Sequence, residues 1–209
     1  MAHVTSLRSY GDPCGIARAL DLIGERWALL IVRELVLGAK RFTDLRTGLR
    51  GASPNVLSQR LDELEAAGVI RKTRAGAPAY ELTPWGQELH PILIQLGRWG
   101  AQSLPRPKGN LSVDALLIAL EATFDAASAR DLEATFELEL AGERFVIELE
   151  RGALHIRRGT ARDPDACITT DPKTLRAVAF GDQRIANSTI AFEGNAQLAQ
   201  RILRMFRRP

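Results

Sequence analysis

Residues 53–68 read SPNVLSQRLDELEAAG. Serine followed by proline is typical of a helix start, because the Ser53 hydroxyl can cap free N–H groups and Pro54 suits the first turn. Three leucines at spacings of four and three share one inward face: Leu57, Leu61 and Leu64. The stretch therefore predicts an amphipathic helix from Pro54 to about Ala67 with a polar outer face, ended by Gly68.

Three more helices are expected before this stretch. They run from Asp12 or Pro13 to about Asp21, from Trp27 to near Gly38, and over 44–49 after a Thr43 cap. The second has an apolar stripe at helical spacing, so one of its faces should be buried.

A hairpin and a long helix are expected after it. Short runs at 69–73 and 79–82 predict two strands around a tip at 74–78, and Thr83-Pro84 opens the next helix. Helices, a turn, a helix and a hairpin follow one another in a winged helix–turn–helix. We therefore expect a mostly helical winged helix–turn–helix domain over 1–104.

The outer face of the 54–67 helix and the hairpin carry side chains suited to DNA. Asn, Gln and Arg can form paired hydrogen bonds with base edges in a major groove, and basic residues on a hairpin can contact phosphates. The candidate DNA-binding residues are Arg41, Ser53, Asn55, Val56, Ser58, Gln59, Arg60, Arg71, Lys72 and Arg74. The pattern alone is equally consistent with a polar helix face that is only solvated.

A family resemblance favours the DNA-binding interpretation. Its residues, in order, are Cys14, 24–27, 30–35, 41–45, 53–61, 64–70, 80–83, Gly86 and 99–100. With this order and spacing the first half resembles the HxlR family of winged helix–turn–helix transcriptional regulators. The chain differs where the family commonly has Gly-Lys before the tryptophan, since it has Glu25-Arg26. It also has a shorter wing, with Ala79 in place of an arginine.

Net charge and composition set broad bounds. The chain of 209 residues has a formal charge of +3, and all of the excess lies in 1–104, where 13 Lys and Arg face 10 Asp and Glu. This modest excess supports nucleic-acid binding only weakly. No apolar run approaches a membrane span, and two cysteines provide no disulfide framework. We expect a cytoplasmic protein with no cofactor and no membrane partner.

The helix after the hairpin carries an apolar seam. Its residues, spaced by four, three, four and three, are Trp85, Leu89, Ile92, Leu96 and Trp99. The seam predicts a homodimer, and packing inside one subunit is the alternative. The family resemblance implies a two-fold dimer formed by this helix and the first one. Two recognition helices would then contact an inverted repeat, with half-sites about one helical turn apart.

Cys14 lies at the start of the first expected helix. Free N–H groups at a helix start favour a thiolate, which makes Cys14 a candidate redox sensor. The alternative is a small apolar residue packed at the dimer seam, and the absence of a neighbouring Lys or His favours this alternative.

The second half reads as a different domain. Prolines and a glycine over 105–110 indicate a linker, and 111–209 then predicts an α+β domain: a helix, three alternating strands, a strand, a helix, a strand and a helix. The strands predict an antiparallel sheet with one wet, charged face, covered by helices on the other.

A second resemblance concerns residues 134–206. The residues that carry it are 165–175, 190–194 and 203–206, and with them the segment is similar to sterol carrier protein-type lipid-binding domains. The resemblance implies a hydrophobic tunnel for a small apolar effector, and a solid core is the alternative. The candidate pocket residues are Leu116, Leu120, Phe124, Phe136, Leu138, Phe145, Ile147, Phe180, Phe192 and Phe206.

No catalytic or metal constellation is evident. The acids Asp171, Asp182 and Glu193 lie at turns or strand ends, and the three histidines are scattered. We therefore expect no enzyme. The leading hypothesis is a homodimeric transcriptional regulator whose domain at 111–209 either senses a small apolar effector or adds dimer contacts. The rival is a lipid carrier whose helical half serves protein association, and DNA affinity that falls steeply with salt would distinguish the two.

Overall fold

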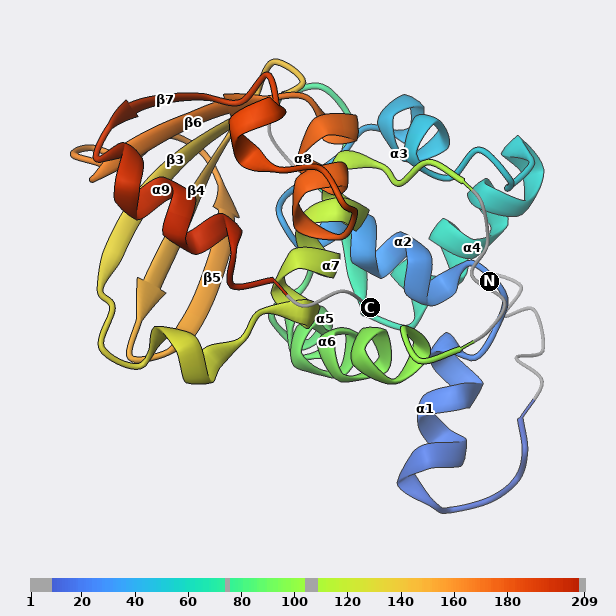
Figure 1. Cartoon of the computed structure of the whole chain (residues 1–209). Helices are drawn as coiled ribbons and strands as arrows, with labels where there is room; N and C mark the ends of the chain where they lie inside the picture. Colours follow the sequence, from blue (N-terminus) through green and yellow to red (C-terminus); the bar gives the residue numbers. More distant parts are fainter. Residues whose placement is uncertain (1–8, 74–75, 104–108, 207–209) are drawn as a thin grey trace. The chain divides into compact units, whose positions relative to one another are not determined.

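The computed structural model describes residues 9–73, 76–103 and 109–206, which form two compact units, 1–93 and 94–209 (Figure 1). Arg74 and most of the expected linker, 104–108, lie outside the described residues.

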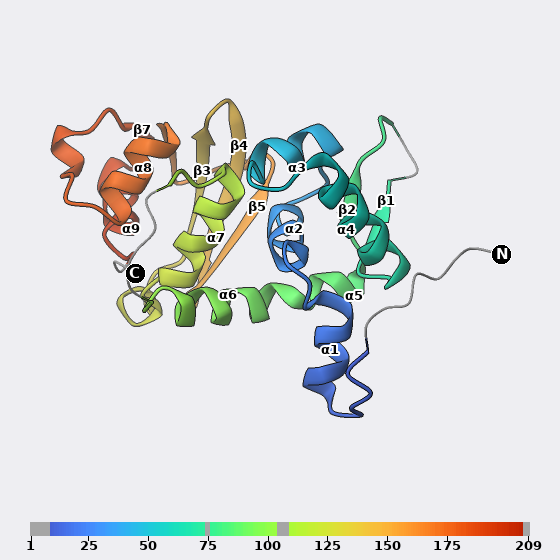
Figure 2. The same cartoon turned by 90° about the vertical axis from the view of Figure 1, so that its right-hand side faces the viewer.

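Four helices open the first unit. They are α1 (Gly15–Ile23), α2 (Ala28–Leu35), α3 (Phe42–Gly48) and α4 (Pro54–Ala66). The Ser53 hydroxyl accepts a hydrogen bond from the Val56 N–H at 3.4 Å, which confirms the predicted cap of α4. The three leucines of α4 are at most 1% exposed, so its predicted inward face is also confirmed. By contrast, α1 has no buried residue; it projects from the rest of the unit (Figure 2) but contacts α4.

A short hairpin follows α4. Strands β1 (Ile70–Lys72) and β2 (Tyr80–Leu82) pair antiparallel, as predicted. Lys40, between α2 and α3, adds a bridge to this wing through two backbone hydrogen bonds with Tyr80, at 2.8 and 2.9 Å. The wing is thus anchored to the helices on its β2 side.

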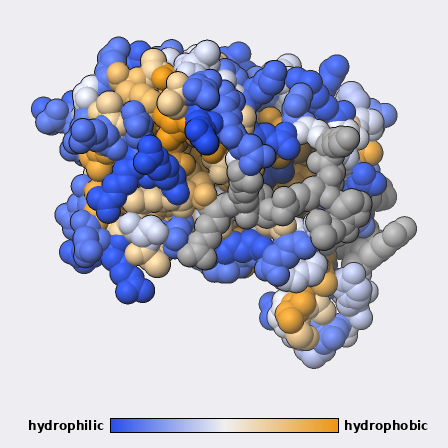
Figure 3. Space-filling model, in the orientation of Figure 1, coloured by the Kyte–Doolittle hydropathy of each residue, from blue (hydrophilic) through white to orange (hydrophobic). Residues whose placement is uncertain are grey.

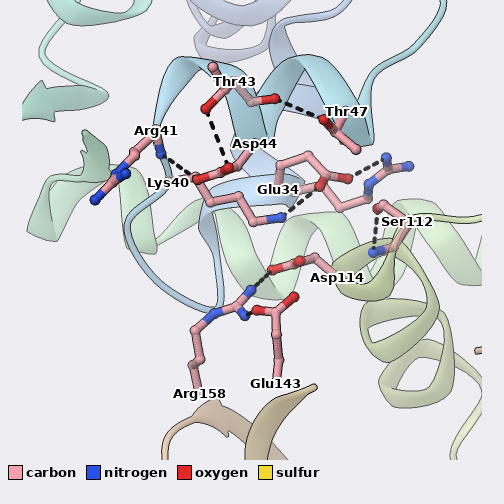
Figure 4. Close-up of polar contacts among 12 residues, drawn as sticks. Glu34, Lys40, Arg41, Thr43, Asp44, Thr47, Ser112, Asp114, Glu143 and Arg158 are labelled. Atoms are coloured by element: carbon pink, nitrogen blue, oxygen red, sulfur yellow. Dashed lines mark hydrogen bonds and ion pairs between the residues drawn. The ribbon is translucent and has the colours of Figure 1, made fainter. Parts of the chain in front are cut away.

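Helix α1 begins at Gly15 and not at Asp12 or Pro13, and two further predicted boundaries were wrong. Helix α3 begins before Thr43, because the Asp44 carboxylate accepts the Arg41 N–H at 3.2 Å (Figure 4). The helix after the wing is divided into α5 (Pro84–Gln87) and α6 (Leu89–Gly100). Pro91 lacks the N–H that would bond the Gln87 carbonyl in a continuous helix, which accounts for the break.

A carboxylate is buried in this helical core. Glu34 on α2 is 0% exposed and pairs with Arg33 and Lys40, both at 2.9 Å (Figure 4). A Cβ on Gly48 would lie 2.5 Å from the Glu34 Oε2, so α3 approaches the carboxylate closely and a larger residue here would displace it. The Glu34–Lys40 ion pair therefore joins α2 to the residue that bridges to the wing, next to Gly48 of α3.

The second unit is an α+β layer structure, which confirms the predicted fold class. Its elements are α7 (Val113–Thr123), η1 (Ala126–Ala129), β3 (Ala134–Leu140), β4 (Glu143–Glu150), β5 (Ala153–Arg158), β6 (Ala166–Thr170), α8 (Pro172–Ala179), η2 (Ile185–Asn187), β7 (Ala191–Gly194) and α9 (Ala196–Leu203). The strand order is β5-β4-β3-β6-β7, and α8 and α9 lie over one face of the sheet (Figure 1). The sheet is antiparallel except that β3 and β6 are parallel, a pairing that the sequence did not predict.

Alternation along the strands separates a core face from a wet face. In β3 every second residue, from Ala134 to Leu140, is at most 8% exposed, while Glu137 and Glu139 lie between them. Arg144 on β4 pairs with both glutamates across the strands. Asp114 at the start of α7 is 1% exposed and bonds Arg158 at 2.8 Å (Figure 4).

Capping of α8 by Asp171 gives a stability prediction. Hydrogen bonds from the Thr174 hydroxyl and from backbone N–H groups lower the pKa of Asp171 below its ordinary value. A lowered pKa stabilises the fold above the unfolded value of about 4, and this contribution is lost as pH falls through the folded value. We expect Asp171→Ala to lower the free energy of unfolding by about 1 kcal/mol at pH 7. The difference should shrink in denaturation experiments below about pH 4.

Asn195 provides the matched control. Its side chain caps α9 by accepting the Leu198 N–H at 3.1 Å, and it carries no charge. Asn195→Ala should therefore cost a similar amount with no change between pH 7 and pH 3. Equal pH dependence in the two variants would contradict the assignment of this pH-dependent stabilisation to the Asp171 carboxylate.

Candidate nucleic-acid interface

The outer face of α4 is polar and open. Asn55, Ser58, Gln59 and Asp62 are exposed and lie on one side of the helix, opposite its three buried leucines. We call these four residues the reading face. Val56 is half-buried, and Ser53 is committed to the helix cap. The side-chain amides of Asn55 and Gln59 have the donor and acceptor pair that an adenine edge requires.

Three exposed arginines lie at the cap of α3, within α3 and in the turn before α4. Arg41, Arg46 and Arg50 are exposed, and none forms an ion pair with a described residue. Of these three arginines, only Arg41 was predicted from the sequence as a site residue. Arg46 and Arg50 were missed, although an arginine in the turn before a recognition helix is a recognisable signal for a phosphate contact.

The cations of the wing are compensated. Arg71 pairs with Glu81 at 2.7 Å, and Lys72 pairs with Glu65 at 2.8 Å. The hydrogen bond to Glu65 is the main cause that raises the pKa of Lys72 above its ordinary value. Both residues lie in the wing as predicted, but their charge is less available to phosphates than that of the α3 arginines.

Arg60 is also held by acids. Its side chain is only 15% exposed and lies between Glu25 at 3.3 Å and Glu63, with which it forms a short ion pair. The structure therefore separates Arg60 from the open reading face, although both belong to α4.

An exposed apolar surface runs along α5 and α6. Of the five residues predicted as a seam, four are at least 43% exposed: Trp85, Ile92, Leu96 and Trp99. Leu89 is half-buried. On α1, Ile16 is 73% and Leu20 is 45% exposed, and they form an apolar patch visible at the lower right of Figure 3. Large apolar residues gathered in this way indicate an interaction surface.

Cys14 occupies the N-cap position of α1 and is exposed. Its backbone N–H donates to the Asp12 carboxylate at 2.8 Å. The thiol is therefore accessible, while its redox role stays a prediction.

The residues predicted to line an apolar pocket pack into the core of the second unit. Eight of the ten are at most 9% exposed, and Phe180 and Phe192 are half-buried. A cleft of about 610 Å³ lies instead beside α8, η2 and α9. Its lining includes Val178, Arg184, Ile185, Leu203, Arg204 and Phe206, so it shares Phe206 with the predicted set.

Two absences concern the described residues. Among residues 9–73, 76–103 and 109–206, no group of three or more His, Cys, Asp or Glu is placed to hold a metal ion. No helix of the same ranges combines the length and apolar character needed to span a bilayer.

The helix pair α3–α4, the hairpin and the open polar face of α4 define a protein of the winged helix–turn–helix class. Residues 22–108 match the HxlR-like helix-turn-helix family, and residues 104–209 match the alkyl sulfatase C-terminal family. The chain belongs to the HxlR-like helix–turn–helix transcriptional regulators, and its second half belongs to the alkyl sulfatase C-terminal family. The sterol carrier-type resemblance is not confirmed, since the matching family is a different one.

Two relatives, YvaP and Rv3095, agree with this assignment. The HTH-type transcriptional regulator YvaP of Bacillus subtilis is 37% identical over 89 residues, which are 41% of this chain and 82% of YvaP. Rv3095 of Mycobacterium tuberculosis, also named as an HTH-type transcriptional regulator, is 39% identical over 98 residues. That match covers 45% of this chain and 61% of the relative, less than two thirds of its length. The crystal structure of the regulator YtcD is 34% identical and covers 44% of this chain and 99% of its own, with a TM-score of 0.41.

Proposed function

We propose that the protein acts as a homodimer that recognises an inverted-repeat operator through α4. The observation that carries this proposal is the reading face, open on α4, together with the exposed arginines Arg41, Arg46 and Arg50 of α3 and of the turn before α4. Amides on a helix of this kind can distinguish base pairs in a major groove, and the arginines can hold the phosphates on either side. Residues 1–104 would carry DNA binding and dimerisation.

Dimerisation is supported by the apolar surfaces of α1 and of the α5–α6 seam. A nine-residue helix with no buried residue is too short to be stable in water on its own. A second copy covering α1 and the seam would bury Ile16, Leu20, Ile92 and Trp99. A two-fold dimer built in this way presents two copies of α4 to one face of the duplex.

Control by a small apolar ligand in residues 111–209 is the remaining part of the proposal. The cleft beside α8 and α9 supports it, because its size lies in the range of ligand sites and its lining includes the apolar residues Leu203 and Phe206. A ligand would regulate only if it bound the DNA-competent state with a different affinity. The redox hypothesis for Cys14 would fail if Cys14→Ser kept wild-type operator binding before and after mild peroxide.

Selection of duplexes from a random pool tests the proposal. We expect an inverted repeat to be enriched, with an affinity that falls steeply as salt rises. Lipid that copurifies with the protein, together with no duplex binding, would support the rival lipid carrier instead.

The reading face predicts the effect of one substitution. Gln59→Ala should weaken the selected operator by about 1–3 kcal/mol, because an amide contact to one base is lost. Preference should relax at that base pair, while affinity for an unrelated duplex should stay unchanged. Fluorescence anisotropy with both duplexes measures this, and Gln87→Ala, at an exposed glutamine of α5, is the control. Unaltered operator affinity in Gln59→Ala would show that the reading face is misassigned.

A further inference from the structure

Four residues join α1 to α2, and this 24–27 link contacts the helix–turn–helix twice. Glu25 Oε2 lies 3.3 Å from Arg60 Nη2 on α4. The ring of Trp27 lies over Gly51 in the turn before α4, and a Cβ on Gly51 would be 2.7 Å from the ring atom Cη2. The link therefore holds both α4 and the turn that leads into it.

The link is itself rigidly placed. A Cβ on Gly24 would lie 2.4 Å from the Leu20 carbonyl, so α1 ends where only glycine fits. Trp27 has φ 82, a left-handed conformation that a bulky side chain adopts only when its surroundings impose it. The Arg26 guanidinium covers the Trp27 ring at 5.3 Å from the centroid. A change in the direction of α1 would thus be passed to the contacts of Glu25 and Trp27.

Arg60 is enclosed on the other side as well. Glu63, one turn further along α4, pairs with the same guanidinium, and Gln59 Nε2 donates to Glu63 Oε1 at 3.0 Å. The Nε of Arg60 is buried. Contact between Arg60 and a base would require both carboxylates to be released. Gln59, by contrast, is exposed on the reading face, and it would give up only its hydrogen bond to Glu63 to contact a base.

We infer that Arg60 is a positioning residue, which ties α4 to the 24–27 link and so sets the orientation of the reading face. This inference rests on the proposed function in one respect, namely that α4 contacts the operator. Because the link directly follows α1, the pair Glu25–Arg60 connects the helix assigned to dimerisation with the helix assigned to base contact. The direct base contact that the sequence predicted for Arg60 becomes the competing outcome.

Glu25→Gln and Arg60→Gln in the full-length protein test the inference on the selected operator. Each should lower operator affinity about tenfold, with the double variant no worse than either single one, because both break the same pair. Preference should weaken across every base pair that α4 contacts. The salt slope should stay at the wild-type value, whereas Arg50→Gln, which removes an exposed cation, should reduce it by about one.

A base or phosphate contact gives a different result. Arg60→Gln would then lose preference at one base pair or lower the salt slope, and Glu25→Gln would keep wild-type affinity, which overturns the inference. If Arg60→Gln does not fold, Glu25→Gln decides alone, since Glu25 is 52% exposed. If the wild type selects no duplex, the proposed function fails, and hydrogen exchange of the α4 amides decides. Faster exchange in Glu25→Gln and Arg60→Gln but not in Arg46→Gln supports the inference, and unchanged exchange overturns it.

Discussion

Replacement of Ile92 by aspartate is expected to convert the proposed dimer to a monomer and to lower operator affinity by about a hundredfold or more. Ile92 is 55% exposed at the middle of the α5–α6 seam. A carboxylate there would have to be buried without a partner in each half of a two-fold interface, which is strongly unfavourable. A monomer binds one half-site at a time and loses the gain in effective concentration that links the two contacts.

Sedimentation at micromolar concentration and operator titration measure the two effects. Gln87→Asp places the same charge at an exposed position of α5 outside the seam, and it should leave both properties unchanged. An Ile92→Asp variant that sediments as a dimer would show that the seam packs elsewhere. A variant that is monomeric but keeps full operator affinity would show that dimerisation is not needed for DNA binding.

Local signals were sufficient to predict most elements of the fold. Ser53, Ser112, Asp171 and Asn195 all accept the N–H bonds that place the start of α4, α7, α8 and α9. The spacing of leucines in α4 predicted its buried face, because helical periodicity, like capping, depends only on residues close in sequence. The start of α3 was mispredicted because the side-chain oxygens of Thr43 and Asp44 both suit a helix start. In the structure the Asp44 carboxylate accepts the Arg41 N–H, which places the start before Thr43.

Long-range pairing could not be predicted in this way. Alternation shows that 134–140 and 166–170 are strands, yet it carries no information on which strand each pairs with or in which direction. The parallel pair β3–β6 depends on the path of the chain from β5 to the other side of β3. Val146 illustrates the same limit, because it lies on the wet face but is 0% exposed between β3 and β5.

The site shows the same division. The sequence placed Asn55, Ser58 and Gln59 on an outer face, and the structure exposes all three. It could not show which arginines are neutralised, because Glu25 meets Arg60 only after α2 and α3 have folded between them. The positive charge available at the interface therefore depends on tertiary structure. Arg46 and Arg50 are exposed, whereas Arg60 is neutralised by Glu25 and Glu63.

Loss of the buried carboxylate of α2 should have the largest effect on folding. Glu34→Ala is expected to lower the free energy of unfolding of the first unit by about 3–5 kcal/mol, because it removes a fully buried carboxylate from its ion pairs with Arg33 and Lys40. Lys40 and Arg33 are only 12% and 22% exposed at their side chains, so water cannot fully replace the lost carboxylate. A cavity beneath Gly48 would add to the loss.

Denaturation followed by the fluorescence of Trp27 and Trp85 measures this, since both lie in the first unit. Glu65→Ala is the matched control, because Glu65 forms a comparable 2.8 Å pair with Lys72 at the surface, where solvent screens it. That variant should lose less than about 1 kcal/mol. Glu34→Gln should fall between the two, since the amide keeps the volume over Gly48 and can still accept one hydrogen bond. Equal stability of the Glu34 and Glu65 variants would mean that burial does not increase the contribution of the Glu34 ion pairs to the free energy of unfolding. The surrounding leucine core alone would then have to maintain the arrangement of α2, Lys40 and α3.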